Sequence, residues 1–198
     1  WRLSQFKAKN FTEKNKKLKK ESIDYFSSAL NIDKKKINFV DHHTTHAYSA
    51  LANIKDWQNA LVFTLDGQGD YISSSVNILN RDELKIVQTT DHYNSIGYFY
   101  SSITSLLGMR AGEHEFKVMG LAPYSNFKYY SSILAKLRNL ITLDKNGNFK
   151  AKNPPVKLRK VLGNIIRYQR FDNVAAAIQA LTEELIISWI NFWIKKTN

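Results

Sequence analysis

Apolar residues in the middle of the chain follow strand-like patterns. Three strands are predicted in succession, at 60–65, 71–79 and 84–89. Polar residues and glycines at 66–70 and 80–83 separate them, so 60–90 predicts a three-stranded antiparallel meander. A further short, buried strand is predicted at 37–40.

Apolar residues three and four positions apart predict helices in the flanking regions. The predicted helices cover 21–30, 44–54, 95–107, 113–121 and a long final stretch that begins with Asp172 as its N-cap. Gly108 and Pro123 end the third and fourth of these helices. The final helix is apolar on its opposite side too, at Ile187, Ile190 and Ile194, which implies burial in a larger body.

The excess of positive over negative charge lies entirely in two segments of the chain. The 198 residues carry a formal net charge of +12, with +7 in 1–36 and +10 in 125–170, against −4 in 37–124. The first twenty residues indicate a linker or a frayed surface helix. Residues 125–170 indicate an irregular segment with a hairpin-like turn at 145–148.

This charge raises nucleic acid as a partner, because Lys and Arg side chains neutralise phosphates. The lysine runs at 16–20 and 34–36 contain little of the aromatic interleaving that stacks bases. They are therefore interpreted as solvated surfaces, and nucleic acid is not the expected partner. A non-enzymatic nucleic-acid-binding module that uses 1–36 and 125–170 stays open as an alternative.

Composition excludes several classes of protein. The chain has no cysteine, which excludes disulfide frameworks, thiolate catalysis and Cys-ligated metal sites. Any metal ligands must be His, Asp or Glu. No stretch reaches the ~20 apolar residues of a membrane span, and the first residues lack the apolar run of a signal peptide. We therefore expect a cytoplasmic setting and no membrane partner.

The segment most suggestive of chemistry lies where a predicted strand gives way to a helix. His42 and His46 are four residues apart, so on a helix both imidazoles project from one face and can share one ion. Asp66 follows the apolar strand at 60–65 and supplies a carboxylate. Two histidines and one carboxylate leave coordination positions open for substrate, and they suit Fe(II), Mn or Zn.

The same residues also fit a purely structural interpretation. His42 and His43 would then cap the helix, and His46 would be a hydrogen-bonded core histidine. On a helix His43 projects about 100° away from His42, so it is a candidate for contact with substrate or with a metal ligand. Asp41 either orients a histidine or caps the helix, and capping is the favoured interpretation.

Two other motifs are weaker. The glycines of the segment 67–70 would let backbone amides approach a phosphate, but a turn between strands is at least as good an interpretation. The segment 112–117 places two carboxylates and Lys117 around one turn. Taken alone, it favours a salt-bridged surface over a site.

Several segments in order resemble the NodU/CmcH O-carbamoyltransferase family. Residues 41–50 resemble its His-His-x-x-His-Ala-x-Ser-Ala motif, and 65–69 its Leu-Asp-Gly-x-Gly turn. The order continues through 96–101 with 107–108, through 115–124, and through 172–179 with 182–184. The resemblance is much weaker over 1–36 and 125–170.

The resemblance implies an α/β protein with part of an actin-like ATPase (ribonuclease H-like) fold. It implies His42, His46 and Asp66 as ligands of a divalent metal, Fe(II) being favoured over Mn or Zn. It further implies transfer of a carbamoyl group from carbamoyl adenylate, made from carbamoyl phosphate and ATP, to a hydroxyl of a small molecule or sugar. His43 is our candidate for assisting removal of the hydroxyl proton. Candidate nucleotide contacts are Gly67, Gly69 and Lys117.

The chain departs from the family pattern in several places. Phe116 replaces the usual Tyr, and Tyr124-Ser125 replaces Tyr-Gly. The family's opening ATPase strands, its Gly-Gly-Val-Ala-Leu-Asn segment, a further metal-binding Asp and the adenylate-forming domain have no counterpart here. We therefore expect a fragment of a longer transferase that does not turn over carbamoyl phosphate alone.

The expected organisation follows from these patterns. The four expected regions are a basic linker or surface helix at 1–36, a metal-binding core at 37–124, a basic irregular insertion at 125–170, and a long buried helix at 171–198 that leads to a missing nucleotide-binding half. A tRNA-modifying carbamoyl transferase is an alternative within the superfamily. That family carries Glu-Gly inside its His-x-x-x-His pair, where this chain has Thr44-Thr45.

Overall fold

A computed structural model of the chain describes residues 2–52, 58–81 and 83–197. Over these residues the fold is mixed α/β, with a three-stranded antiparallel sheet, a two-stranded hairpin and seven α-helices. The helices are α1 (Arg2–Leu30), α2 (His42–Ala52), α3 (Ile96–Leu106), α4 (Glu115–Leu121), α5 (Phe127–Arg138), α6 (Pro155–Ile166) and α7 (Phe171–Thr197). The strands are β1 (Asn59–Gly69), β2 (Ile72–Asn80), β3 (Glu83–Asp91), β4 (Ile141–Leu143) and β5 (Phe149–Ala151), and three single turns of 3₁₀ helix are η1 (Lys34–Lys36), η2 (His92–Asn94) and η3 (Ala122–Tyr124).

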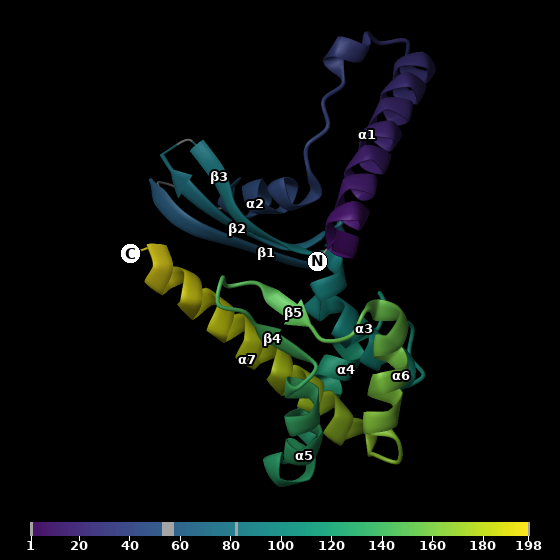
Figure 1. Ribbon diagram of the computed structural model, residues 1–198, viewed down its shortest axis with the longest axis vertical. Helices are drawn as coiled ribbons and strands as arrows, with labels where there is room; N and C mark the ends of the chain where they lie inside the picture. The colour runs from purple at the N-terminus through teal and green to yellow at the C-terminus, as the bar shows by residue number, and fades with distance from the viewer. Residues whose placement is uncertain (1, 53–57, 82, 198) are drawn as a thin grey trace.

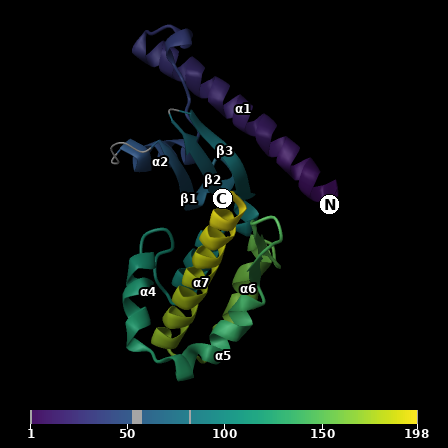
Figure 2. The same ribbon diagram turned by 90° about the vertical axis from the view of Figure 1, so that its left-hand side faces the viewer.

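The sheet separates two unequal layers. Figures 1 and 2 show α2 on one side of the sheet, helices α3 to α7 on the other, and α1 extending away from both. No helix in the described ranges combines the length and the apolar character needed to cross a bilayer.

The predicted meander is confirmed. Strands β1, β2 and β3 pair antiparallel in that order, with Phe63 opposite Val76 and Val76 opposite Gln88. Asp70 and Tyr71 join β1 to β2, and both have positive φ, 51° and 67°. Two central residues with positive φ define the type I′ turn that matches the twist of a hairpin, although Tyr tolerates this conformation poorly.

The main core lies between the sheet and the helical layer. Trp189 of α7 is 2% exposed, and its ring lies 5.0 Å from the rings of both Phe63 in β1 and Phe149 in β5. The predicted apolar face of α7 is confirmed, since its residues at three- and four-residue spacing are buried: Val174, Ile178, Leu181, Leu185 and Trp189. The helix thus spans the core from end to end.

Several sequence predictions about local structure are wrong. Residues 37–40 form no strand, and Phe39 and Val40 are exposed, because no neighbouring strand in the described residues pairs with them. The segment 125–170 is regular, since it contains α5, the β4–β5 hairpin and α6. The hairpin turn predicted at 145–148 is confirmed within it.

Other elements begin or end away from their predicted bounds. The lysine-rich start and the helix predicted at 21–30 form one helix, α1. Helix α2 begins at His42, two residues early, and the predicted end at residue 54 lies outside the described residues. Asp172 lies in the first turn of α7 and not at its N-cap. On the far side of α7, Ile187 is 59% and Ile194 42% exposed, and the predicted burial of this side in a larger body stays a prediction.

Candidate metal centre

Helix α2 presents two histidines to the end of strand β1. The amide of Thr45 donates to the Asp41 carbonyl at 2.9 Å, which closes the first turn of the helix. The four-residue spacing places both rings on one face, as predicted, and the Nε2 atoms of His42 and His46 lie 3.0 Å apart.

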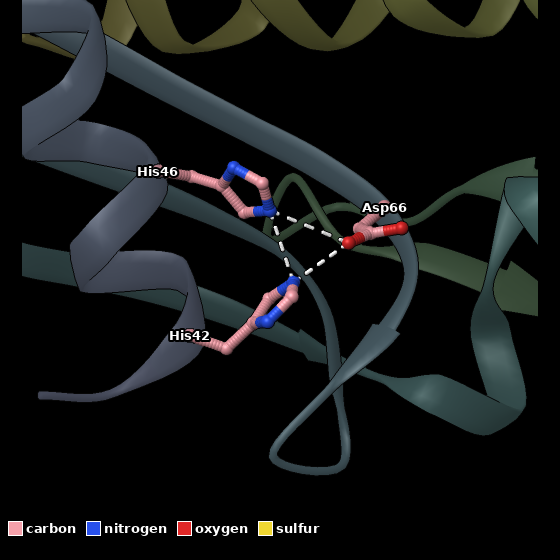
Figure 3. A group of neighbouring side chains, drawn as sticks. All are labelled: His42, His46 and Asp66. Atoms are coloured by element: carbon pink, nitrogen blue, oxygen red, sulfur yellow. Dashed lines mark hydrogen bonds and ion pairs between the residues drawn. The ribbon is translucent and has the colours of Figure 1, made fainter. Parts of the chain in front are cut away.

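Asp66 reaches these histidines from an irregular part of β1. Leu65 pairs with Ser74, and the next pair is Gly69 with Ile72. Residues 66–68 therefore stand opposite the single residue Ser73, which makes a bulge that turns the strand locally. Asp66 Oδ2 lies 2.7 Å from His42 Nε2 and 3.4 Å from His46 Nε2 (Figure 3).

The three ligand atoms fit one metal ion. Two atoms that each lie ~2.1 Å from an ion are ~3.0 Å apart at the ~90° angle of octahedral coordination and ~3.4 Å apart at the ~109° angle of tetrahedral coordination. The separations of 2.7, 3.0 and 3.4 Å in this group lie close to these values. The side chains of His42, His46 and Asp66 are 39%, 51% and 38% exposed, so the group is open to solvent on one side. An ion held by these residues would keep positions open for water or substrate.

The surroundings of Asp66 favour the ionised form of its carboxyl group. Partial burial would raise the pKa of Asp66, but hydrogen bonds from His42, the Gly67 amide and His46 outweigh it and lower that pKa. The carboxylate is therefore ionised at neutral pH, as a metal ligand must be.

Asp70, which the sequence does not single out as a ligand or a cap, holds the start of α2. Its carboxylate accepts a hydrogen bond from the His42 amide at 3.0 Å, which satisfies a helix amide that has no partner inside the helix. Asp41 Oδ1 pairs with Lys19 of α1 at 2.8 Å, and among the described residues no helix amide donates to its side chain, so the favoured capping role of Asp41 is not seen. The strained turn at Asp70 thus places a capping carboxylate beneath the first candidate ligand.

Gly69 provides the space for the His42 ring. A Cβ atom on Gly69 would overlap the ring carbons of His42, whereas a Cβ atom on Gly67 would have nothing within 4 Å. The predicted contact of these two glycines with a nucleotide stays a prediction. In the structure the Gly67 amide donates to the Asp66 carboxylate at 2.6 Å, so this amide contacts a candidate metal ligand.

His43 lies on the sheet side of α2 and is 2% exposed. Its Nε2 donates to the Ile72 carbonyl at 2.9 Å, and its Nδ1 accepts from the Thr64 hydroxyl at 2.6 Å. Burial lowers the pKa of His43, so the ring is neutral at pH 7. Its predicted part in proton removal stays a prediction, and it would require one of these two hydrogen bonds to open.

The His43 contact continues through a chain of buried polar groups in the sheet. Thr64 Oγ1 lies 2.7 Å from the Ser75 hydroxyl, and the Asn77 amide nitrogen donates to Ser75 at 2.9 Å and to the Val62 carbonyl at 3.1 Å. Because such groups are costly to bury without partners, this series of hydrogen bonds holds α2 in one position on the sheet. It thereby fixes the distance between the histidines and Asp66.

Lys117 lies on the exposed surface of α4, with its ammonium group 5.7 Å from the centre of the Phe116 ring. Among the described residues, no hydrogen bond or ion pair joins it to the candidate metal centre. Its predicted nucleotide contact stays a prediction. Glu113 pairs at 3.0 Å with Arg110, which lies outside the segment 112–117, and Glu115 accepts from the Gly112 amide at 2.7 Å. Among the described residues no ion pair joins Lys117 to either carboxylate, so the salt-bridged surface predicted within 112–117 is only partly seen.

Sequence reasoning missed the residues that position the ligands. Asp70 and Thr64 lie 28 and 21 residues away from the helix residues that they contact. Their only sequence signals are an acidic residue after a glycine-rich turn and a polar residue inside an apolar strand.

Comparison with known proteins agrees with the predicted resemblance. Residues 3–198 match the family described as the carbamoyltransferase N-terminus. The chain is 40% identical over 112 residues to the uncharacterized protein MJ1051 of Methanocaldococcus jannaschii, a match that covers 57% of the chain and 20% of that protein.

Two nodulation proteins are also similar. The match to NolNO of Sinorhizobium fredii is 36% identical over 95 residues and covers 48% of the chain and 14% of that protein. The match to NolO of Bradyrhizobium diazoefficiens is 28% identical over 165 residues and covers 80% of the chain and 29% of that protein. The chain thus spans less than a third of the length of each relative. With nearly all of its residues matched, the chain belongs to the carbamoyltransferase N-terminus family.

Proposed function

We propose that this chain forms the metal-binding part of an O-carbamoyltransferase. The observation that carries the proposal is the convergence of His42, His46 and Asp66, with 2.7 to 3.4 Å between their ligand atoms, in a member of this family. The three residues would hold a divalent metal, with Fe(II) favoured and Mn or Zn open. The metal would supply Lewis-acid polarisation of carbonyl or phosphate oxygens.

The proposed reaction is transfer of a carbamoyl group from carbamoyl adenylate to an alcohol. The hydroxyl oxygen forms a bond to the carbamoyl carbon, and the bond from that carbon to the phosphate oxygen breaks. AMP leaves with the electron pair, and the hydroxyl proton passes to a base. The chain itself would contribute by positioning the carbamoyl donor next to the acceptor hydroxyl. Holding two reactants in contact removes much of the entropic cost of their encounter.

The proposal includes a finer fold assignment, an actin-like ATPase domain of which this chain is one part. An antiparallel three-stranded meander with helices on both faces supports it. ATP or carbamoyl adenylate, carbamoyl phosphate and a hydroxyl-bearing small molecule are its proposed ligands. These belong to the longer protein that the relatives represent, since the chain spans 14–29% of the three relatives compared.

Metal analysis of the purified chain tests this proposal. The chain is loaded anaerobically with Fe(II), or with Mn(II) or Zn(II), and its bound metal is measured beside the variants His42→Ala, His46→Ala and Asp66→Ala. We expect about one metal per chain in the parent and a loss of at least ten-fold in affinity in each variant.

The matched control is His114→Ala. His114 accepts a hydrogen bond from the Arg110 amide at 3.1 Å and lies at the start of α4, outside the candidate centre. This variant should bind metal like the parent. Equal metal binding in all the variants would overturn the proposal.

A further inference from the structure

An open cavity of about 420 Å³ lies between η2, α3 and the start of α6. Its lining includes Gln68, Tyr98, Ser102, Ser105 and Arg159. Figure 1 shows α3 and α6, which contribute to this lining, beside each other below the sheet. The volume falls in the range of small-molecule sites, which is roughly 300–1,000 Å³.

The cavity adjoins the candidate metal centre through one short segment of backbone. The bulge of β1 contributes Asp66 to that centre and Gln68 to the cavity wall. Ser95, the N-cap of α3, donates to the Asp66 carbonyl at 3.3 Å. A Cβ atom on Gly97 would lie 2.8 Å from Gly67 Cα, so α3 packs directly on the bulge. A ligand in the cavity would therefore contact Gln68, which lies two residues along the backbone from Asp66.

Five of the lining residues carry a hydroxyl group, and among the described residues no carboxylate lines the cavity. Serine and tyrosine hydroxyls and the Gln68 amide both donate and accept hydrogen bonds, which suits a ligand with many hydroxyl groups. Glu115 lies behind the wall, and its oxygens accept from the Ser101 hydroxyl and, at 2.7 Å, from the Gly112 amide. The wall therefore offers no lining carboxylate to an ammonium group.

Arg159 gives the cavity a positive charge. Its Nη1 donates to the Ser105 hydroxyl at 2.8 Å, which holds the guanidinium at the wall. Over the described ranges no carboxylate forms an ion pair with it. Helix α6 also carries Lys157 and Lys160 and no acidic residue. An unneutralised guanidinium beside several hydroxyl groups favours a negative group on the ligand and disfavours a positive one.

We propose that this cavity binds the hydroxyl-bearing acceptor, and that the acceptor is a sugar-like polyol that is neutral or negatively charged and has no ammonium group. The identification of the ligand as an acceptor rests on the proposed function. Binding of such a polyol in the cavity does not rest on it.

The test uses three probes that share one sugar ring and differ in charge: glucose 6-phosphate, glucose and glucosamine. Each is titrated into the purified chain at neutral pH and low ionic strength, and binding is followed by NMR at the backbone amides of Tyr98, Ser102 and Ser105. We expect glucose 6-phosphate to bind about ten-fold more tightly than glucose, because it gains a charge-assisted hydrogen bond. Glucosamine should bind most weakly.

Two matched variants locate the effect. Arg159→Gln should reduce the affinity for glucose 6-phosphate to that for glucose. Lys157→Gln removes the same charge from the same helix but from a residue outside the lining, and it should leave the preference within about two-fold. Tyr98→Phe and Ser102→Ala should weaken the binding of glucose and of glucose 6-phosphate alike.

Three outcomes would overturn the proposal. These are no response of the cavity amides to any probe, glucosamine binding as tightly as glucose 6-phosphate, and equal losses in Arg159→Gln and Lys157→Gln. The proposed function is tested separately by metal analysis. If the His42→Ala/His46→Ala double variant still binds sugar, sugar binding in the cavity is supported independently of the metal centre. If a chain that binds metal does not bind sugar, only the cavity proposal is refuted.

Discussion

The two faces of the sheet are built from different kinds of residue. Toward the helical layer, Phe63 and Val76 pack with Trp189 in an apolar core. Toward α2, Thr64 and Ser75 hydrogen-bond in a chain that ends on His43. The apolar face provides non-directional stabilisation, whereas hydrogen bonds fix distances and angles. The candidate metal centre lies on the face whose contacts are directional.

The largest expected effect is a loss of stability from the apolar face. Trp189→Ala should lower the free energy of unfolding by ~3–5 kcal/mol, because it leaves a cavity among aromatic neighbours. Urea denaturation of the purified chain measures it. The matched control is Ile187→Ala, which removes an apolar side chain that is 59% exposed on the same helix and should cost well under ~1 kcal/mol. Equal costs would contradict the assignment of the core.

A smaller effect is expected from the polar face. Thr64→Val should lower the free energy of unfolding by ~1–3 kcal/mol, because it leaves His43 Nδ1 buried without a donor. It should also weaken metal binding by roughly ten-fold, because α2 loses a contact that places its histidines. Thr64→Ser keeps the hydroxyl and should restore most of the metal affinity. If Thr64→Val and Thr64→Ser bound metal alike, the hydrogen bond from Thr64 to His43 would have no role in positioning the metal ligands.

Gly67 in the bulge and Gly69 just after it test how the position of the His42 ring affects metal binding. Gly69→Ala should displace the His42 ring and weaken metal binding by roughly ten-fold, because the added Cβ atom overlaps that ring. Gly67→Ala introduces the same atom where nothing lies within 4 Å, so it should bind metal like the parent. Metal titration of both variants checks this. Weaker binding in Gly67→Ala alone would be incompatible with the geometry of the bulge.

The smallest effect at neutral pH concerns a polar contact on the apolar side. Burial, together with Glu115 and Glu183, raises the pKa of Tyr100 to about 12, and its hydroxyl donates to Gln179 at 2.8 Å. A group whose pKa is raised by folding stabilises the fold below its unfolded pKa, which is ~10 for Tyr, and that contribution is lost as pH rises toward 12.

Comparison of unfolding at pH 8 and above pH ~10 measures this loss. Tyr100→Phe should show a shallower decline in stability over the alkaline range than the parent. A decline of the same steepness in both proteins would show that Tyr100 titrates in the folded chain like an exposed tyrosine.

Predictions from the sequence succeeded where a pattern is local. The meander at 60–90 and the helix at 95–107 are confirmed, because alternation and three- or four-residue spacing each imply one backbone geometry. Residues 37–40 have strand-like composition but no partner strand in the described chain, and a strand is stable only when it is paired. Within 125–170, Leu158, Leu162 and Ile166 have the four-residue spacing of a helix. The basic residues around them made the segment look like an irregular surface.

The sequence by itself determined that His42 and His46 share one face, because four residues make about one helical turn. Only the tertiary structure decided that Asp66 meets them, since a bulge whose register depends on strand pairing turns the strand at that point. The cap from Asp70 and the link from Thr64 to His43 likewise depend on contacts between segments more than twenty residues apart. Residue spacing defines contacts within one helical turn, but the relative positions of separate elements follow from the packing of the whole sheet.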